Sequence, residues 1–225
     1  MGRIPGGSIA AADGKIIALG EKKDIEASVE LENAEIIDAA GKIVAPGFVD
    51  CHTHLVFGKS RVREFAMKMT MTRAEIEASG LQTGIPASIF MTRETGEDEL
   101  FVDAMDRLGR MLRYGSTTVE SKSGYGISWP HERKMLAVNR RLSQAQPIEL
   151  ISTFLGAHDF PPEIDRENNS QRERYVNELT EEMIPRVAEE RLAEFCDVYC
   201  DTGYYTAAES EQILRSGMDY GLAPR

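Results

Sequence analysis

The sequence has few of the residues that build cross-linked or metal-rich small proteins. Its 225 residues include three cysteines, four histidines and one tryptophan. An odd number of cysteines without a dense framework gives no support to a disulfide-built secreted scaffold and favours reduced thiols. We therefore expect a cytoplasmic protein whose fold depends on an apolar core, and the 42% of hydrophobic residues are sufficient for one.

Positive charge and long apolar runs are also scarce. Lysine and arginine number 26 against 37 aspartates and glutamates, which gives a formal net charge of −11. No basic cluster is interleaved with aromatic residues, so no nucleic-acid partner is expected. The longest apolar runs are strand-sized, and the N-terminal MGRIPGGSIA lacks the apolar segment of a signal peptide. We therefore expect no membrane association.

Two hairpins are predicted in the first part of the chain. SIAAADGKIIALG, residues 8–20, predicts two short strands joined at Asp13-Gly14, a dipeptide suited to the positive φ angles of a tight turn. AEIIDAAGKIVAPG, residues 34–47, repeats the pattern with a turn near Gly41. Residues 1–45 are therefore assigned to a small β-rich domain.

Strand-like and helix-like segments alternate over residues 46–225. A capping box at Thr95-x-x-Asp98 predicts one helix, a kink is expected at Pro185, and Thr206-x-x-Glu209 opens the last helix. The stretch SGLQTGIPASIFMTRET is interpreted as a loop. Four βα units predict an α/β fold with a parallel sheet. Four strands make only half of an eight-stranded barrel, and the final GLAPR is typical of the approach to a fifth strand, so we expect the natural protein to continue.

Chemically capable residues follow three of the predicted strands. His52 and His54 lie two apart on the first strand and so share a face with Asp50, while Tyr125 and His158 follow the next two strands. Sites in parallel α/β folds gather at the carboxyl ends of strands. Neutral imidazoles suit a divalent metal ion, but a pair of hydrogen-bonded, half-exposed histidines fits the same pattern, so both interpretations stay open at this point.

Several stretches of the sequence resemble the imidazolonepropionases, a family of the amidohydrolase superfamily. PGFVDCHTH marks the superfamily, and LVFGKSRVREF, KSGYG and FLGAH, in that order, are specific to the family. The resemblance runs from about residue 8 to the end of the chain. It implies the amino-terminal half of such a protein, with the first four βα units of an amidohydrolase (β/α)8 barrel and an N-terminal segment of a small β-sandwich.

The resemblance also implies a reaction and its residues. The reaction is hydrolysis of the cyclic amide of 4-imidazolone-5-propanoate to N-formimino-L-glutamate in histidine degradation, with one zinc or iron ion as cofactor. By match to the family, His52 and His54 are metal ligands, Arg61 holds the substrate carboxylate, Tyr125 contacts the substrate, and His158 lies near the carbonyl under attack. The expected partners are a small-molecule substrate and, in the full-length form, a second copy in a homodimer.

The resemblance places a third histidine ligand, a catalytic glutamate and an aspartate ligand beyond Arg225. We therefore expect this chain alone to be inactive. Two alternatives remain: another deaminase or cyclic amidase of the superfamily, and a catalytically inactive truncated fragment. Lys122 is not expected to be a carbamylated lysine between two metals, and Cys51, Cys196 and Cys200 are expected to be packed thiols.

Overall fold

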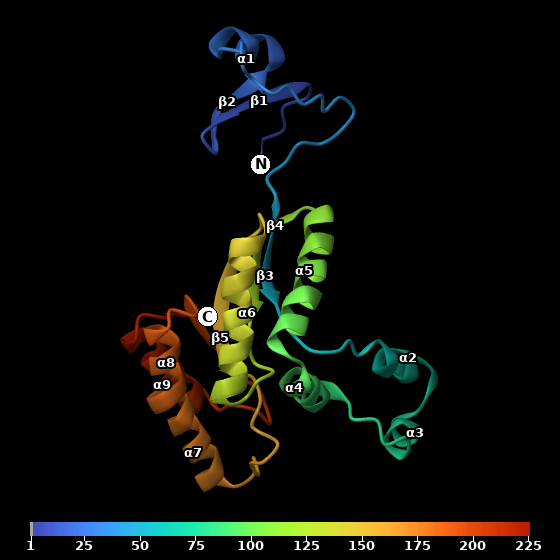
Figure 1. Ribbon diagram of the computed structural model, residues 1–225, viewed down its shortest axis with the longest axis vertical. Helices are drawn as coiled ribbons and strands as arrows, with labels where there is room; N and C mark the ends of the chain where they lie inside the picture. Colours follow the sequence, from blue (N-terminus) through green and yellow to red (C-terminus); the bar gives the residue numbers. More distant parts are fainter. Residues whose placement is uncertain (1) are drawn as a thin grey trace. The chain divides into compact units, whose positions relative to one another are not determined.

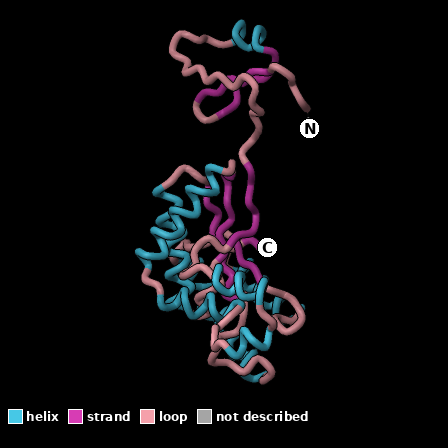
Figure 2. Tube along the Cα trace, turned by 90° about the vertical axis from the view of Figure 1, so that its right-hand side faces the viewer, coloured by secondary structure: helices cyan, strands magenta, loops and turns pink. Residues whose placement is uncertain are grey.

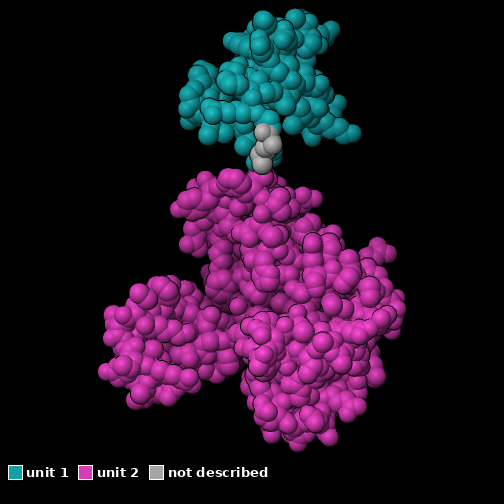
Figure 3. Space-filling model, turned by 180° about the vertical axis from the view of Figure 1, so that it is seen from behind, with its two compact units in different colours: residues 1–46 teal, residues 47–225 magenta. Residues whose placement is uncertain are grey.

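A computed structural model describes residues 2–225, and the chain divides between Pro46 and Gly47 into two units (Figure 3). The first unit contains the predicted hairpin, formed by antiparallel β1 (Gly7–Ala12) and β2 (Lys15–Glu21). Its turn residues, Asp13-Gly14, take φ angles of 51° and 72°, which are the left-handed conformations that a two-residue hairpin turn requires.

The second predicted hairpin is not formed. β2 is followed by a helix that was not predicted, α1 (Lys22–Ser28), and residues 34–47 contain no strand. The apolar side chains of this stretch are exposed, with Ile37 81% and Ile43 94% accessible. An isolated pair of short strands is marginal in water unless a further layer covers its apolar face. Residues 34–47 do contain the apolar side chains of a strand pattern, but no second layer of the described structure covers them, and no strand forms.

The second unit is built on a parallel sheet in which the strands follow their order in the chain (Figure 1). At least one helix lies between each strand of this sheet and the next in the chain. The predicted βα alternation and the α/β class are therefore confirmed. The fifth strand consists of two residues in the predicted GLAPR stretch. The strands are β3 (Phe48–Thr53), β4 (Ser116–Lys122), β5 (Glu149–Ala157), β6 (Phe195–Val198) and β7 (Ala223–Pro224).

Helices gather on one side of this sheet, as Figure 2 shows. Apolar side chains of α5, α6, β4 and β5 form one core cluster, and those of β5, β6 and the last helices form another. None of the helices in residues 2–225 is long and apolar enough to cross a bilayer. The helices are α2 (Val62–Thr70), α3 (Arg73–Ala78), α4 (Gly84–Glu94), α5 (Glu97–Arg113), α6 (Trp129–Ala145), α7 (Asn169–Glu178), α8 (Ile184–Glu189) and α9 (Ala207–Asp219).

Two local predictions fail around Thr95. The stretch interpreted as a loop contains α4, and Thr95 terminates that helix, because its Oγ1 donates to the Met91 carbonyl oxygen at 2.7 Å. α5 then begins after Gly96, which provides no side-chain cap. The capping box of α9 is confirmed: the Thr206 hydroxyl accepts from the Glu209 N–H at 3.3 Å, and the Glu209 carboxylate accepts from the Thr206 N–H at 2.7 Å.

The long helical segment near Pro185 contains a wider turn. α7 runs into a π-helical turn, Leu179–Met183, and α8 follows without a break. Pro185 lies just after this turn, and its missing N–H removes one hydrogen bond from the continuous helical segment. The predicted irregularity is therefore present, in the form of an enlarged turn. Four buried side chains follow each other at intervals of four residues: Tyr175, Leu179, Met183 and Val187.

Candidate functional site

Rings from three strand ends meet at the carboxyl edge of the sheet. The centroid of the His54 ring, just after β3, lies 4.4 Å from that of His158, at the end of β5, and 4.7 Å from that of Tyr125, after β4. The His52 ring lies 6.1 Å from His54. Parallel strands end at a common edge, so residues distant in sequence come together there. The structure thus gathers four of the five predicted site residues into one ring cluster, defined as His52, His54, Tyr125 and His158.

Arg61, the fifth, lies at the start of α2, where Glu64 holds it. Its Nη1 donates to the Glu64 carboxylate at 3.2 Å, and Glu64 also accepts from Lys68 and from the Gly84 N–H. Burial alone would raise the pKa of Glu64, but these donors outweigh burial and lower it. Burial raises the pKa of Tyr125, and the positive charge of Arg61 opposes that rise. Arg61 therefore acts electrostatically on Tyr125 of the ring cluster.

His54 is electrically neutral in this environment. Burial, followed by the proximity of His158 and His52, lowers its pKa to about 3, although the backbone of Ser123 opposes the shift. Within residues 2–225 its buried Nδ1 has no hydrogen-bond partner. Leaving such a polar atom unsatisfied costs roughly 1–3 kcal/mol. A neutral ring with an unsatisfied nitrogen is chemically suited to bind a metal ion.

The available donor set suits a metal ion but is incomplete. His52 is exposed and adjacent to His54 on the same strand face, so both imidazoles can reach one ion. Among the residues that the structure describes, no group of three or more histidines, cysteines, aspartates or glutamates is arranged to hold a metal. In the same range Asp50, which shares this strand face, makes no side-chain hydrogen bond to either ring.

His158 has a defined hydrogen position. Its Nδ1 lies 3.0 Å from the carbonyl oxygen of Gly124. A carbonyl oxygen only accepts, so Nδ1 carries the hydrogen and the neutral ring presents a lone pair at Nε2. Burial lowers the pKa of His158, against the opposing effects of the Gly124 carbonyl and Asp159. A neutral His158 therefore accepts a hydrogen bond from a ligand, and only the protonated ring donates one.

Tyr199 was not identified from the sequence. It directly follows β6, and its ring centroid lies 5.9 Å from that of His158. Its other neighbour is Tyr204, at 4.2 Å. The rule that function gathers at strand ends would have found it, because it occupies the first position after the fourth strand of the sheet. Tyr199 extends the ring cluster toward the β6–α9 loop.

Lys122, which ends β4, is engaged in a buried ion-pair network. Its Nζ donates to Glu120 Oε1 at 2.9 Å and to Asp197 Oδ2 at 2.8 Å, and its side chain is 2% exposed. The Thr153 hydroxyl also donates to Glu120, at 2.6 Å. The network joins β4, β5 and β6 beneath the strand ends. Asp197 was missed in the sequence because its partner is distant along the chain.

The cysteines differ from the expectation at two of three positions. Cys196 in β6 is buried, and burial raises its pKa to about 12. Cys51 and Cys200 are exposed rather than packed. β3 is an edge strand of the sheet, and Cys200 lies past the end of β6, so neither thiol has a second layer to cover it.

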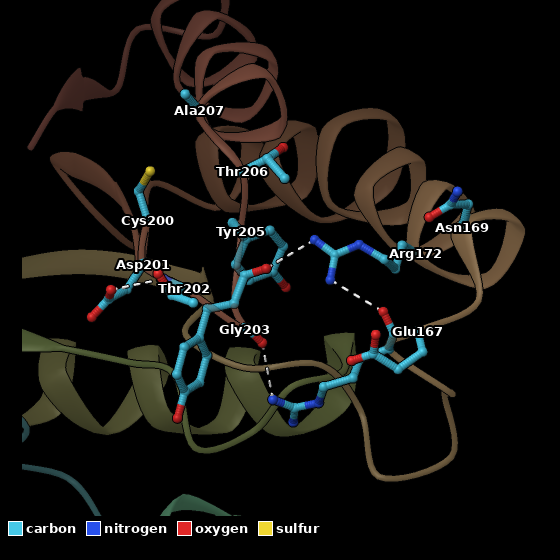
Figure 4. Close-up of a pocket in the computed structure, with 12 residues that line it drawn as sticks. Glu167, Asn169, Arg172, Cys200, Asp201, Thr202, Gly203, Tyr205, Thr206 and Ala207 are labelled. Atoms are coloured by element: carbon cyan, nitrogen blue, oxygen red, sulfur yellow. Dashed lines mark hydrogen bonds between the residues drawn. The ribbon is translucent and has the colours of Figure 1, made fainter.

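A separate hollow of about 630 Å³ lies beside the β6–α9 loop (Figure 4). Its two arginines are already paired, Arg166 with Asp159 at 2.6 Å and Arg172 with Glu209 at 2.6 Å. Arg172 also donates to the Tyr204 carbonyl oxygen at 2.8 Å, and Arg166 to that of Gly203 at 3.3 Å. These guanidinium groups connect the loops that follow β5 and β6. Both groups are engaged within the chain, so no ligand is assigned to the hollow.

The fold and the site indicate the class of protein to which this chain belongs. A family model described as "Amidohydrolase family" matches residues 35–79, which include His52, His54 and Arg61. A solved structure of 5-methylcytosine deaminase from Klebsiella pneumoniae, liganded with 5-fluorocytosine, matches with a TM-score of 0.55 at 16% identity, over 96% of this chain and 46% of that one. That likeness concerns the fold alone. The class is that of the amidohydrolases, hydrolases that in general use a divalent metal ion.

Curated relatives narrow the class. Imidazolonepropionase from Geobacillus sp. (strain WCH70) is 42% identical over 99% of this chain and 52% of its own length. Imidazolonepropionase from Clostridium tetani (strain Massachusetts / E88) is 41% identical over 97% of this chain and 51% of its own length. The resemblance to the amino-terminal half of the imidazolonepropionases is thereby confirmed. The chain spans about half the length of the curated relatives it matches.

Proposed function

We propose that this chain supplies half of an enzyme that hydrolyses 4-imidazolone-5-propanoate to N-formimino-L-glutamate, a step of histidine degradation. The observation that carries the proposal is the ring cluster, in which His54, Tyr125 and His158 from three successive strand ends lie 4.4–5.1 Å apart. The printed names of the curated relatives support the same reaction. Nothing among the described residues favours a deaminase over this cyclic amidase.

We propose zinc or iron as the cofactor, with His52 and His54 as two of its ligands. The neutral state of His54 and its unsatisfied buried nitrogen support this assignment. A bound ion of this kind supplies a water whose pKa falls toward ~7. Two imidazoles satisfy only half of a tetrahedral ion, so the proposal requires ligands from outside this chain. The 225-residue chain alone is therefore expected to bind metal weakly and to be inactive.

Arg61 is proposed to bind the propionate of the substrate. Glu64 engages its Nη1, and within residues 2–225 its Nε and Nη2 have no hydrogen-bond acceptor, so a planar pair of donors remains for a carboxylate. The buried Glu64 fixes the direction of the guanidinium in advance. This arrangement favours a substrate with a negatively charged arm, which a nucleobase lacks.

Tyr125 and His158 are proposed to hold the ring of the substrate. The hydroxyl of Tyr125 stays protonated, because burial raises its pKa above the ordinary value of 10.0, and it can donate to a ring carbonyl. The Nε2 lone pair of neutral His158 can accept from a ring N–H. Donation from His158 to a developing oxyanion, as predicted from the sequence, requires that the ring first take up a proton.

Three further predictions concern the complete protein. We propose that β3–β7 belong to a (β/α)8 barrel and that the hairpin of β1 and β2 belongs to a small β-sandwich. A homodimer, a small-molecule substrate and no nucleic-acid or membrane partner remain predictions from the sequence. A cytoplasmic location likewise rests on the cysteine usage.

The test measures ring opening of the substrate by the complete gene product. The reaction is monitored as a decrease in substrate absorbance. We expect turnover of 4-imidazolone-5-propanoate and much weaker turnover of the same ring without its propionate. Arg61→Gln should raise KM for the first substrate and leave the second unchanged, so that the preference disappears. Arg63→Gln, two positions along α2, is the matched control and should keep the preference. A complete product that deaminates a nucleobase, or that ignores the propionate, would contradict the proposal.

A further inference from the structure

The loop that presents Tyr125 adopts a backbone conformation that needs outside support. Gly124 takes a φ of 109°, and a Cβ there would lie 2.8 Å from that of His158. Ile127, fully buried, takes a φ of 51°. A β-branched residue at positive φ is strained by about 1–3 kcal/mol, and such a conformation persists only when its surroundings fix it. Residues 123–127 must therefore be held by specific contacts.

One buried carboxylate gathers the N–H groups of this loop. Glu132, in the first turn of α6, is 0% exposed. Its Oε1 accepts from the N–H of Gly126 at 2.7 Å and from that of Ile127 at 2.8 Å, and its Oε2 accepts from Gly124 at 3.1 Å. Within the described part of the chain no lysine or arginine forms an ion pair with it. Burial raises the pKa of Glu132, and the hydrogen bonds from these backbone N–H groups oppose that rise.

Three carbonyl groups of the same loop are also occupied. Arg93 of α4 donates from Nε to the Gly126 oxygen at 2.8 Å and from Nη2 to the Ile127 oxygen at 3.1 Å. The third carbonyl, that of Gly124, faces Nδ1 of His158. The peptide unit that Glu132 holds through its N–H group is therefore next to the carbonyl that sets the hydrogen position on His158.

We propose that Glu132 is a positioning residue of the site, which holds the Tyr125 loop and, through Gly124, keeps the hydrogen of His158 on Nδ1. Its carboxylate touches neither ring and acts only through the backbone. A glutamine at this position keeps one oxygen for two of the three N–H groups but replaces the oxygen that accepts from Gly124 with an NH2 group. The Gly124 N–H then loses its acceptor, and the strained loop loses a contact that fixes its conformation. The importance of this role for catalysis rests on the proposed function.

The first test uses the unaltered chain. Hydrogen exchange is measured by NMR for the amides of Gly124, Gly126 and Ile127, and for Gly203 in an exposed loop as the reference. The three amides lie outside helices and strands, yet we expect exchange at least about tenfold slower than at Gly203, because each has a buried acceptor. Exchange as fast as at Gly203 would overturn the proposal.

The second test uses Glu132→Gln and reads the ring nitrogens of His158 by ¹⁵N NMR. The unaltered chain should show a protonated Nδ1 and a bare Nε2, and the variant should lose this fixed assignment. Glu209→Gln is the matched control, because it removes another partly buried carboxylate, bonded to Arg172 and Thr206, without touching the loop. We expect it to retain the His158 signature.

A folded Glu132→Gln chain with an unchanged His158 signature would overturn the proposal, and so would an equal change in Glu209→Gln. If Glu132→Gln does not fold, the exchange measurement on the unaltered chain decides alone. Both readouts are made without substrate or metal. They can therefore fail while the complete product turns over its substrate, and they can succeed while it does not, which separates this proposal from the proposed function.

Discussion

Removing the charge of Lys122 should destabilise the second unit more than removing any surface lysine. The Lys122 side chain is 2% exposed and lies between Glu120 and Asp197, at 2.9 and 2.8 Å. Lys122→Met retains the length of the side chain and removes the ammonium. The two carboxylates, one 5% and the other 16% exposed, then lose the cation between them, and Glu120 retains the longer ion pair with Arg225 at 3.6 Å.

The magnitude follows from the partners that remain. Breaking a buried ion pair by removing one member costs about 3–5 kcal/mol. The lower end applies here, because the Thr153 hydroxyl still donates to Glu120 and water reaches Asp197. We therefore expect a loss of about 3 kcal/mol in the free energy of unfolding. Adding Glu120→Gln to Lys122→Met should restore part of this loss, since it removes one of the two neighbouring negative charges.

The assay is urea unfolding at pH 7 followed by far-ultraviolet circular dichroism. Lys134→Met is the control, because Lys134 donates only to the carbonyls of Thr92, Arg93 and Thr95. Glu120→Gln should not restore stability in the Lys134 background. A loss below about 1 kcal/mol for Lys122→Met, or equal recovery in both backgrounds, would refute the reasoning.

Three other outcomes are expected. A thiol reagent should modify Cys51 and Cys200 in the native chain but spare Cys196, whose pKa is about 12, and rapid labelling of all three would contradict the described burial. Calorimetric titration with zinc should show weak binding that His54→Ala abolishes, and equal binding by the variant would remove His54 from the metal site. The donors around Glu209 lower its pKa below the ordinary 4.5, so the stability it provides is present above that pH and is lost as pH falls through the lowered value. Glu209→Gln should therefore flatten the acid limb of the stability curve, and an unchanged limb would count against this ion pair.

The sequence was sufficient to identify three candidate site residues that lie at the end of a strand. His54, Tyr125 and His158 were each identified from a position at the end of a predicted strand, and parallel pairing brings such positions to one edge. The capping box at Thr206 was also predictable, because its two partners are three residues apart. In both cases the determining contacts are local or follow from the topology.

Predictions failed where the partner is distant or where two local signals compete. Glu132 was not identified from the sequence, because the N–H groups it binds belong to a loop before its helix. Thr95 fits a capping box, yet it closes α4, since the following Gly96 already starts α5. The apolar residues of 34–47 signal strands, but a strand also requires a neighbour, and the pattern alone does not provide one.

The enlarged turn at Leu179–Met183 keeps the helical segment in register with the core. Four residues rotate an ordinary helix by about 400°, so side chains at strict four-residue intervals drift by about 40° per step. Over the three steps from Tyr175 to Val187, the buried side chains would shift by about a third of a turn around the axis of an ordinary helix. A π-helical turn contains more residues than an ordinary turn, so it reduces this shift and keeps the four side chains on one face. Deleting one residue from this turn should therefore give an ordinary helix in which Val187 follows Tyr175 by about 1,100°, or three turns and about 20°, so that both side chains still face the core.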